Sequence, residues 1–125
     1  MNTEREQEWS DSQPIYRQVR DMLAEMILED TVKEGESMPV VRRVAAEFRL
    51  SPLTVLKGYR RLVDEGVVET RRGLGMFVRE GGRKKLLTAE REKFLNEEWP
   101  RVYDMILRLG LNAEELLGVD SGNSG

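Results

Sequence analysis

The stretch TRRGLGMFVRE, residues 70–80, holds the side chains with the most evident chemistry in this chain. Arg71 and Arg72 precede Gly73-Leu74-Gly75, and an apolar run follows at once. Two kinds of site use such a combination. A glycine-rich turn can present backbone N–H groups to a phosphate, and arginines on a short turn can contact the phosphates and bases of a duplex.

The phosphate-binding alternative requires a helix after the glycines, because in such loops G-x-G follows a strand and opens a helix. Here Met76-Phe77-Val78 continues as a strand-like run, and Val67-Val68-Glu69-Thr70 precedes the turn in the same pattern. The glycines permit the positive φ angles that a tight hairpin needs. The sequence therefore predicts a β-hairpin with a basic tip.

Composition argues against most other chemistry. The 125 residues include no cysteine and no histidine, so the commonest general base and the usual zinc ligands are missing. The neighbouring carboxylates Glu97-Glu98 and Glu114-Glu115 would face different directions on a helix and would not converge. We expect neither an enzyme nor a bound metal or other cofactor.

The chain also lacks signals for a membrane or for secretion. Its N-terminus, MNTEREQEWSD, is acidic and polar, the opposite of a secretory signal. No apolar run approaches the roughly 20 residues that a membrane span needs. We expect a cytoplasmic protein without membrane contact, in which residues 1–11 form a disordered lead-in.

The net charge of −3 hides an uneven distribution. Residues 37–85 carry 12 basic and 5 acidic side chains, net +7, whereas residues 1–36 have net −6 and residues 86–125 net −4. Because a nucleic acid responds to the local field, a basic middle between acidic flanks is compatible with DNA binding.

Apolar periodicity predicts three helices before the hairpin. A stripe at spacings of three and four indicates a helix at about 14–30, and VVRRVAAEF, 40–48, indicates a short second one. Ser51-Pro52 reads as an N-cap followed by proline at the first helical position, opening a helix at about 52–65. The tight turn around Leu50-Ser51 makes the last two a helix-turn-helix pattern.

This pattern alone leaves two interpretations open, a DNA reader and a three-helix core with a solvated basic face. In the first, the N-terminal end of the third helix enters the major groove. The basic hairpin that follows directly favours the reader, because such a ribbon can straddle the backbone and place an arginine in the minor groove.

The C-terminal part is predicted to be helical from Leu86 to Leu117, with Thr88 as a cap and a kink near Trp99 because of Pro100. Asn112 is expected to cap a short helix at about 113–117, before a disordered tail at 119–125. The apolar side chains of this C-terminal helical part exceed what a small core can cover. We therefore expect a dimer interface formed by Leu95, Trp99, Val102, Tyr103, Ile106 and Leu107.

Residues 14–79 resemble the winged helix-turn-helix of the GntR family of bacterial transcription regulators. The resemblance rests on an ordered set of motifs: Gly35, Met38-Pro39-x-x-Arg42, Val44-Ala45, Leu50-Ser51-Pro52-x-Thr54-Val55, Tyr59, Leu62, Gly66 and Thr70-Arg71-Arg72-Gly73-x-Gly75-x-Phe77-Val78. The short helical tail resembles the YtrA-type subfamily, which lacks a large ligand-binding domain and pairs through its C-terminal helices.

The resemblance implies that Arg42 contacts phosphate and a guanine edge, that Ser51 and Thr54 contact phosphate, and that the hairpin tip enters the minor groove. The full set of expected DNA contacts is Arg42, Arg43, Ser51, Pro52, Leu53, Thr54, Lys57, Arg61, Arg71, Arg72, Gly73 and Leu74. The chain departs from the family pattern at Val40, Pro52, Leu53 and Leu56, where polar residues or arginines are frequent. We expect Leu53 to meet a thymine methyl group.

Together these features predict a mainly α fold with a small β-hairpin: a winged helix-turn-helix domain at 12–80 and a C-terminal helical dimerisation segment at 81–118. The expected function is a homodimeric, sequence-specific repressor of a transporter operon that binds a palindromic operator in double-stranded DNA. The alternative is a winged-helix interaction module that does not bind DNA.

Met22 and Met26 are expected to be core residues, and no residue identifies a small-molecule effector.

Overall fold

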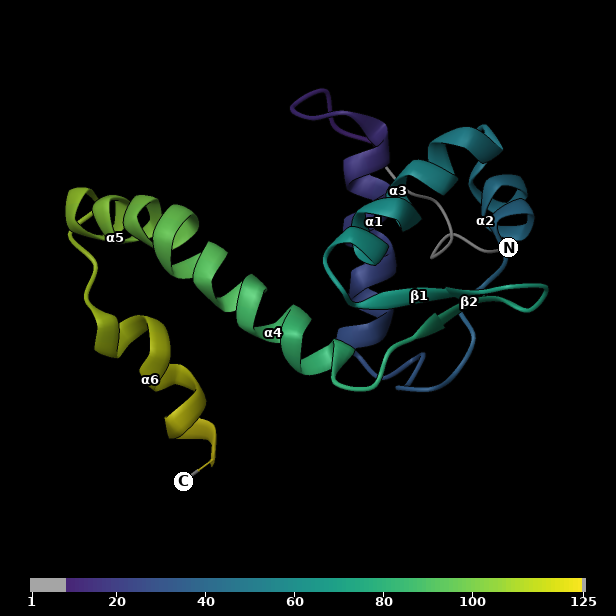
Figure 1. The fold of residues 1–125 in the computed structure, drawn as a ribbon. Coiled ribbons are helices and arrows are strands. Elements are labelled where there is room, and N and C mark those ends of the chain that lie inside the picture. Colours follow the sequence, from purple (N-terminus) through teal and green to yellow (C-terminus); the bar gives the residue numbers. More distant parts are fainter. Residues whose placement is uncertain (1–8, 125) are drawn as a thin grey trace. The chain divides into compact units, whose positions relative to one another are not determined.

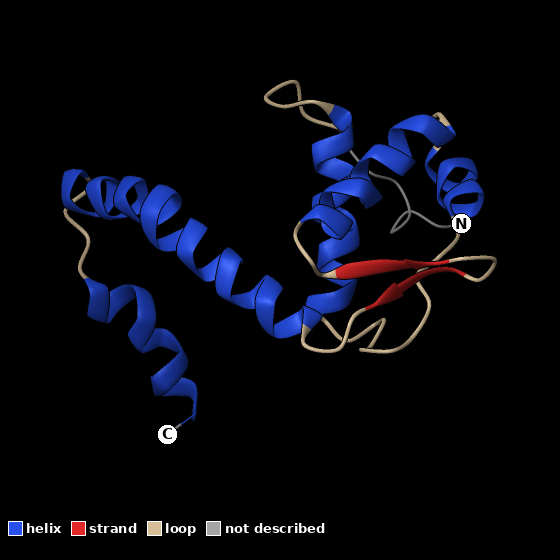
Figure 2. Ribbon diagram, in the orientation of Figure 1, coloured by secondary structure: helices blue, strands red, loops and turns tan. Residues whose placement is uncertain are grey.

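The computed structural model describes residues 9–124 and consists of two compact units, one up to Thr88 and one from Ala89 (Figure 1). It is mainly α-helical with one two-stranded hairpin, as predicted (Figure 2). The elements are α1 (Ile15–Leu28), α2 (Val41–Phe48), α3 (Pro52–Asp64), β1 (Val68–Arg71), β2 (Gly75–Val78), α4 (Gly82–Lys93), the π-helical segment η2 (Phe94–Glu98), α5 (Trp99–Arg108) and α6 (Ala113–Ser124).

The core of the first unit forms where the apolar stripes of α1 and α3 meet. Both helices carry apolar side chains at spacings of three and four, which places them on one face. Burying these faces supplies the main driving force for folding of the unit. The fully covered side chains are Val19, Leu23 and Ile27 of α1, Val55, Tyr59 and Leu62 of α3, Val78 of β2 and Leu86 of α4.

A glycine sets how closely α1 and α3 approach. A Cβ atom added to Gly58 would lie 2.8 Å from Cγ1 of Val19 and 3.2 Å from the backbone nitrogen of Arg20. The second of these is a backbone atom that cannot rotate away as a side chain can, so the two helices would have to shift apart slightly. The position therefore requires the smallest residue, even though glycine is a poor helix former.

We expect Gly58→Ala to lower the free energy of unfolding by about 1–3 kcal/mol, the usual cost of overfilling a packed core. Urea unfolding followed by circular dichroism measures the change. Arg60→Ala, at an exposed site of the same helix, is the control and should stay within about 0.5 kcal/mol of the parent. Equal or higher stability of Gly58→Ala would show that the helix contact is not tight.

An ion pair in the same unit links α1 to the end of α3. The guanidinium of Arg20 in α1 donates from Nε to Glu65 Oε2 at 3.1 Å and from Nη2 to Glu65 Oε1 at 2.5 Å. Arg20 is almost completely covered and Glu65 is half-buried, and the two parallel hydrogen bonds give this contact a defined geometry. It fixes the register of α1 against α3.

The hairpin pairs Val68 with Val78 and Arg71 with Gly75 in antiparallel register. The other edge of β2 is also occupied, because the backbone N–H of Met38 donates to the carbonyl of Met76 at 2.8 Å and that of Gly35 donates to the carbonyl of Val78 at 2.8 Å. The segment before α2 thus lies along β2, and the hairpin is attached to the helical core.

The start of α4 differs from the sequence prediction. The helix begins at Gly82, before the predicted start at Leu86, and Thr88 lies in its interior and is not a cap. Arg83 donates from Nη2 to the carbonyl of Leu28 at 2.7 Å, and Leu86 is buried. These tertiary contacts hold the first turns of α4 in the first unit, which extends to Thr88.

The N-terminal prediction needs a similar correction. Most of the predicted disordered lead-in, residues 1–8, lies outside the described residues. Trp9 instead packs on the core, with its ring centroid 6.3 Å from that of Phe48 in an edge-to-face contact. Ser10 donates its backbone N–H to Gln18 Oε1 at 2.8 Å, which ties the segment to α1.

In the second unit, the predicted interruption near Trp99 takes the form of the π-helical turn η2. The N–H of Trp99 donates to the carbonyl of Phe94, five residues back, next to Pro100, which has no N–H to donate. Asn112 caps α6 as predicted by accepting from the N–H of Glu115 at 2.7 Å. The helix runs to Ser124, past the predicted end at 117 and through most of the predicted disordered tail.

Candidate nucleic-acid interface

The turn between α2 and α3 comprises Arg49, Leu50 and Ser51. Arg49 adopts a left-handed conformation with φ of 57°, and its N–H donates to the carbonyl of Ala45. The Ser51 hydroxyl accepts from the N–H groups of Leu53 at 3.1 Å and Thr54 at 3.3 Å, which confirms the predicted N-cap. Its hydroxyl proton is still available to donate to a phosphate.

The outer face of α3 is polar and basic except near its start. Val55, Gly58, Tyr59 and Leu62 turn toward the core, so the intervening residues face solvent. Among the predicted contacts, Ser51, Pro52, Leu53, Lys57 and Arg61 are exposed, and Thr54 is half-buried. Arg60, which was not in the predicted set, is equally exposed on this helix.

The N-terminal end of α2 lies beside the N-terminal end of α3. Val40, Val41 and Arg42 from the first line an open depression of about 530 Å³ together with Pro52 from the second. The Tyr59 hydroxyl donates to the carbonyl of Pro39, which holds this end of α2 against α3. Burial raises the pKa of the Tyr59 phenol, so the group stays protonated and able to donate.

The two arginines of the hairpin have different roles. Arg71 belongs to β1 and not to the tip: its Nε donates to Glu69 Oε2 at 2.9 Å, and its guanidinium lies 4.1 Å from the centre of the Phe77 ring. Arg72, Gly73 and Leu74 form the loop, where Gly73 has φ of 75°. Arg72 is exposed and has no ion pair with any carboxylate of residues 9–118.

Backbone connections bring the three parts to one region. The hydrogen bond between Met38 and Met76 lies three residues before the first residue of α2. On the hairpin it lies one residue after the start of β2, close to the loop. The depression joins α2 to α3. The segment that leads into α2 is therefore attached to β2 close to the hairpin loop, and the start of α2 borders the start of α3. A reader helix followed by a wing uses this arrangement.

The described residues do not neutralise the charges of this region. Arg42, Arg43, Lys57 and Arg61 are exposed, and none of them forms an ion pair in the part of the chain whose side chains are described. By contrast, Arg20 of α1 is paired with Glu65 at the end of α3. Unpaired cations can exchange their counterions for phosphates, which favours association with DNA.

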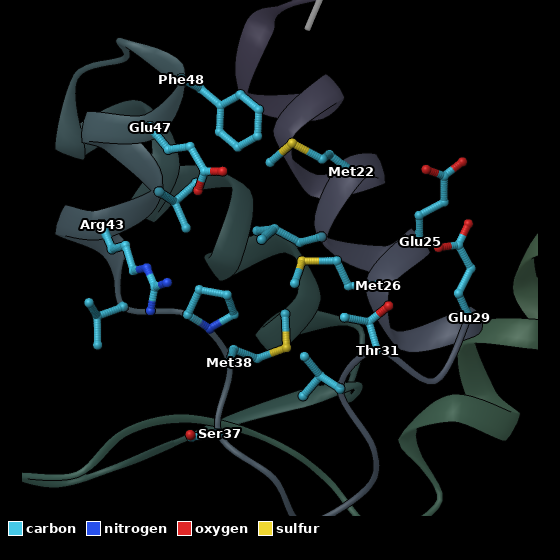
Figure 3. A pocket seen from close by; sticks show the side chains of 15 residues that line it. Met22, Glu25, Met26, Glu29, Thr31, Ser37, Met38, Arg43, Glu47 and Phe48 are labelled. Atoms are coloured by element: carbon cyan, nitrogen blue, oxygen red, sulfur yellow. The ribbon is translucent and has the colours of Figure 1, made fainter. Parts of the chain in front are cut away.

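A second hollow lies between α1 and α2, which each pack on α3 and not closely on one another. It measures about 720 Å³, and Met22, Met26 and Met38 line it together with Phe48. Figure 3 shows Met22 extending from α1 toward Phe48 of α2. Met22 and Met26, predicted to be core residues, are half-buried and pack on the core while they also line this pocket.

The family model for the bacterial regulatory proteins of the gntR family matches residues 15–78, which include the whole helix-turn-helix and hairpin. The chain belongs to the GntR family. Its match ends at the last residue of β2, so every predicted DNA contact of this GntR regulator lies inside the matched region.

Individual relatives extend the comparison beyond the DNA-binding domain. The chain is 29% identical to the transcriptional regulator YhcF of Bacillus subtilis over 88% of its own length and 89% of that protein. It is 37% identical to the transcriptional repressor YtrA of the same organism, over 61% of this chain and 58% of YtrA. A GntR-family regulator structure from Bacteroides thetaiotaomicron superposes with a TM-score of 0.67 at 28% identity, covering 87% of this chain and 95% of that one.

These comparisons identify the molecule as a DNA-binding winged-helix transcription regulator of the YtrA type. The relatives are regulators and not enzymes, in agreement with the absence of a predicted catalytic site. Within the described residues, the structure contains no cluster of acidic side chains fit to hold a metal ion. None of the described helices is both long and apolar enough to span a membrane.

Proposed function

We propose that the protein is a homodimeric repressor that binds a palindromic operator and acts in the cytoplasm. Each protomer would place the N-terminal end of α3 in the major groove and the hairpin loop in the adjacent minor groove. The observation that supports this proposal is the set of exposed basic side chains on α2, α3 and the hairpin of a GntR-family domain, which form no ion pair among the described residues apart from that of Arg71 with Glu69.

The case for a dimer comes from the second unit. Although η2 and α5 are rich in apolar side chains, neither contains a buried residue. The six predicted interface residues are exposed apart from Ile106, which is half-buried. A short helical segment without a core of its own is not stable alone, so these side chains require a partner surface.

The spacing of these residues fits a second helix. Leu95, Trp99, Val102 and Ile106 follow one another at intervals of four, three and four, the spacing of a helix–helix seam. The rings of Trp99 and Tyr103 lie 5.9 Å apart and extend the apolar face sideways. A second copy of the chain offers the same face, and a two-fold axis would make the contact self-complementary.

Two-fold pairing determines the form of the operator. Two reader helices related by a two-fold axis match a palindrome whose half-sites lie about one helical turn, roughly 34–36 Å, apart. A bound dimer on such a site would block access of polymerase to the promoter. The resemblance to YtrA, which is named a repressor, supports repression, and the YtrA-type resemblance suggests a transporter operon as the target.

Selection of bound sequences from random duplex DNA tests the proposal. We expect enrichment of a palindrome, and an affinity that falls steeply with salt because each neutralised phosphate releases counterions. A folded protein that enriches no sequence and shows no binding to random duplex at low salt would instead be an interaction module of the winged-helix type. A monomer at micromolar concentration in sedimentation equilibrium would contradict the dimer.

A further inference from the structure

The basic face also carries an apolar patch. The patch consists of Val40 and Val41 at the start of α2 and Pro52 and Leu53 at the start of α3. Val40 is 60% exposed and Leu53 is 59% exposed, although both flank the reader-helix N-terminus. Three of the four residues line the same depression as Arg42.

Contact between such a patch and DNA is unfavourable in free energy unless the group on the DNA is also apolar. A major groove presents hydrogen-bond donors and acceptors from every base pair, and an apolar side chain opposite such a group leaves it without a partner. The one apolar group on a base edge in the major groove is the C5 methyl of thymine. Cytosine carries hydrogen at the same position, so the methyl distinguishes two pyrimidines by shape.

We propose that the apolar patch reads thymine by packing against its C5 methyl group at the starts of α2 and α3. The inference rests on the proposed DNA-binding function and adds the base class that this protein selects. Because the outer face of α3 has Pro52 and Leu53 in its first turn, its start offers no bidentate side chain for a purine there. Apolar contact is then the source of discrimination at those positions.

The size of the effect follows from the area of one methyl. Removing it from water contributes about 0.8 kcal/mol, which corresponds to about a fourfold change in the dissociation constant. Two methyl groups in one half-site would together change the dissociation constant by about 15-fold. The palindrome repeats the contact in the second half-site. Effects of this size are within reach of a competition assay.

The experiment uses the operator obtained by selection and replaces each thymine in turn by deoxyuridine. This change removes only the methyl and leaves the Watson–Crick edge intact. We expect one or two positions per half-site at which the dissociation constant rises about fourfold. If all uracil-substituted operators bind within 1.5-fold of the parent, the inference is overturned while the DNA-binding function stands.

Protein variants identify the side chains that make the contact. Leu53→Ser and Val40→Ser should bind the thymine operator more weakly and should bind the thymine and uracil operators equally. Lys57→Ala is the matched control: it weakens both operators through a lost phosphate contact and keeps their ratio unchanged. Thermal unfolding checks that each variant is folded.

The outcomes distinguish failure of the inference from failure of the proposed function. Variants that keep the full thymine preference would show that the patch does not make the contact, which overturns the inference. A parent protein that enriches no operator would overturn the inference together with the proposed function.

Discussion

Replacing Val102 with Asp is expected to convert the protein to a monomer and to weaken binding to the full palindrome by about 100-fold or more. Val102 lies in the middle of the proposed helix seam and is 44% exposed in the single chain. In a dimer the new carboxylate would be buried without a partner. The loss of affinity follows because linking two binding modules raises overall affinity by roughly 10²–10⁴-fold.

Two measurements separate this cause from misfolding. Sedimentation equilibrium gives the mass, and binding to a single half-site should be nearly unchanged because the basic face is intact. Arg101→Asp, the same acidic residue on the neighbouring exposed position of α5, is the control and should remain a dimer. A dimeric Val102→Asp protein with full operator affinity would place the interface elsewhere.

The second large effect is expected from the hairpin. Changing both Arg71 and Arg72 to alanine should weaken operator binding by about 10- to 100-fold. The slope of the logarithm of the binding constant against the logarithm of the salt concentration should become shallower by about one to two, because each phosphate contact contributes about one to this slope. The single variants should differ. Arg72→Ala removes a cation that forms no ion pair with the described residues, whereas Arg71→Ala also removes the ion pair with Glu69 and the contact with the Phe77 ring.

Fluorescence anisotropy over a range of salt concentrations measures both the affinity and the slope. Arg91→Ala, an exposed position in α4 outside the basic face, is the control and should leave both unchanged. If the double variant binds as tightly as the parent at all salt concentrations, the hairpin does not touch DNA.

The sequence by itself determined the elements that depend on local interactions. Ser51 and Pro52 marked the start of α3, Asn112 marked the start of α6, and the glycines around Leu74 indicated a hairpin. Caps, proline positions and turn glycines act over a few residues, so their effect can be read from a short stretch of chain. The family motifs added the expected contacts in the same region.

The tertiary structure decided what depends on residues far apart in the sequence. The early start of α4 follows from the contact of Arg83 with Leu28, and Arg71 is engaged by Phe77 across the strand pair. Likewise, Val40 and Pro52 form one depression only because α2 and α3 pack with their starts side by side. Burial and charge pairing between distant segments leave no local pattern, so only the folded chain shows them.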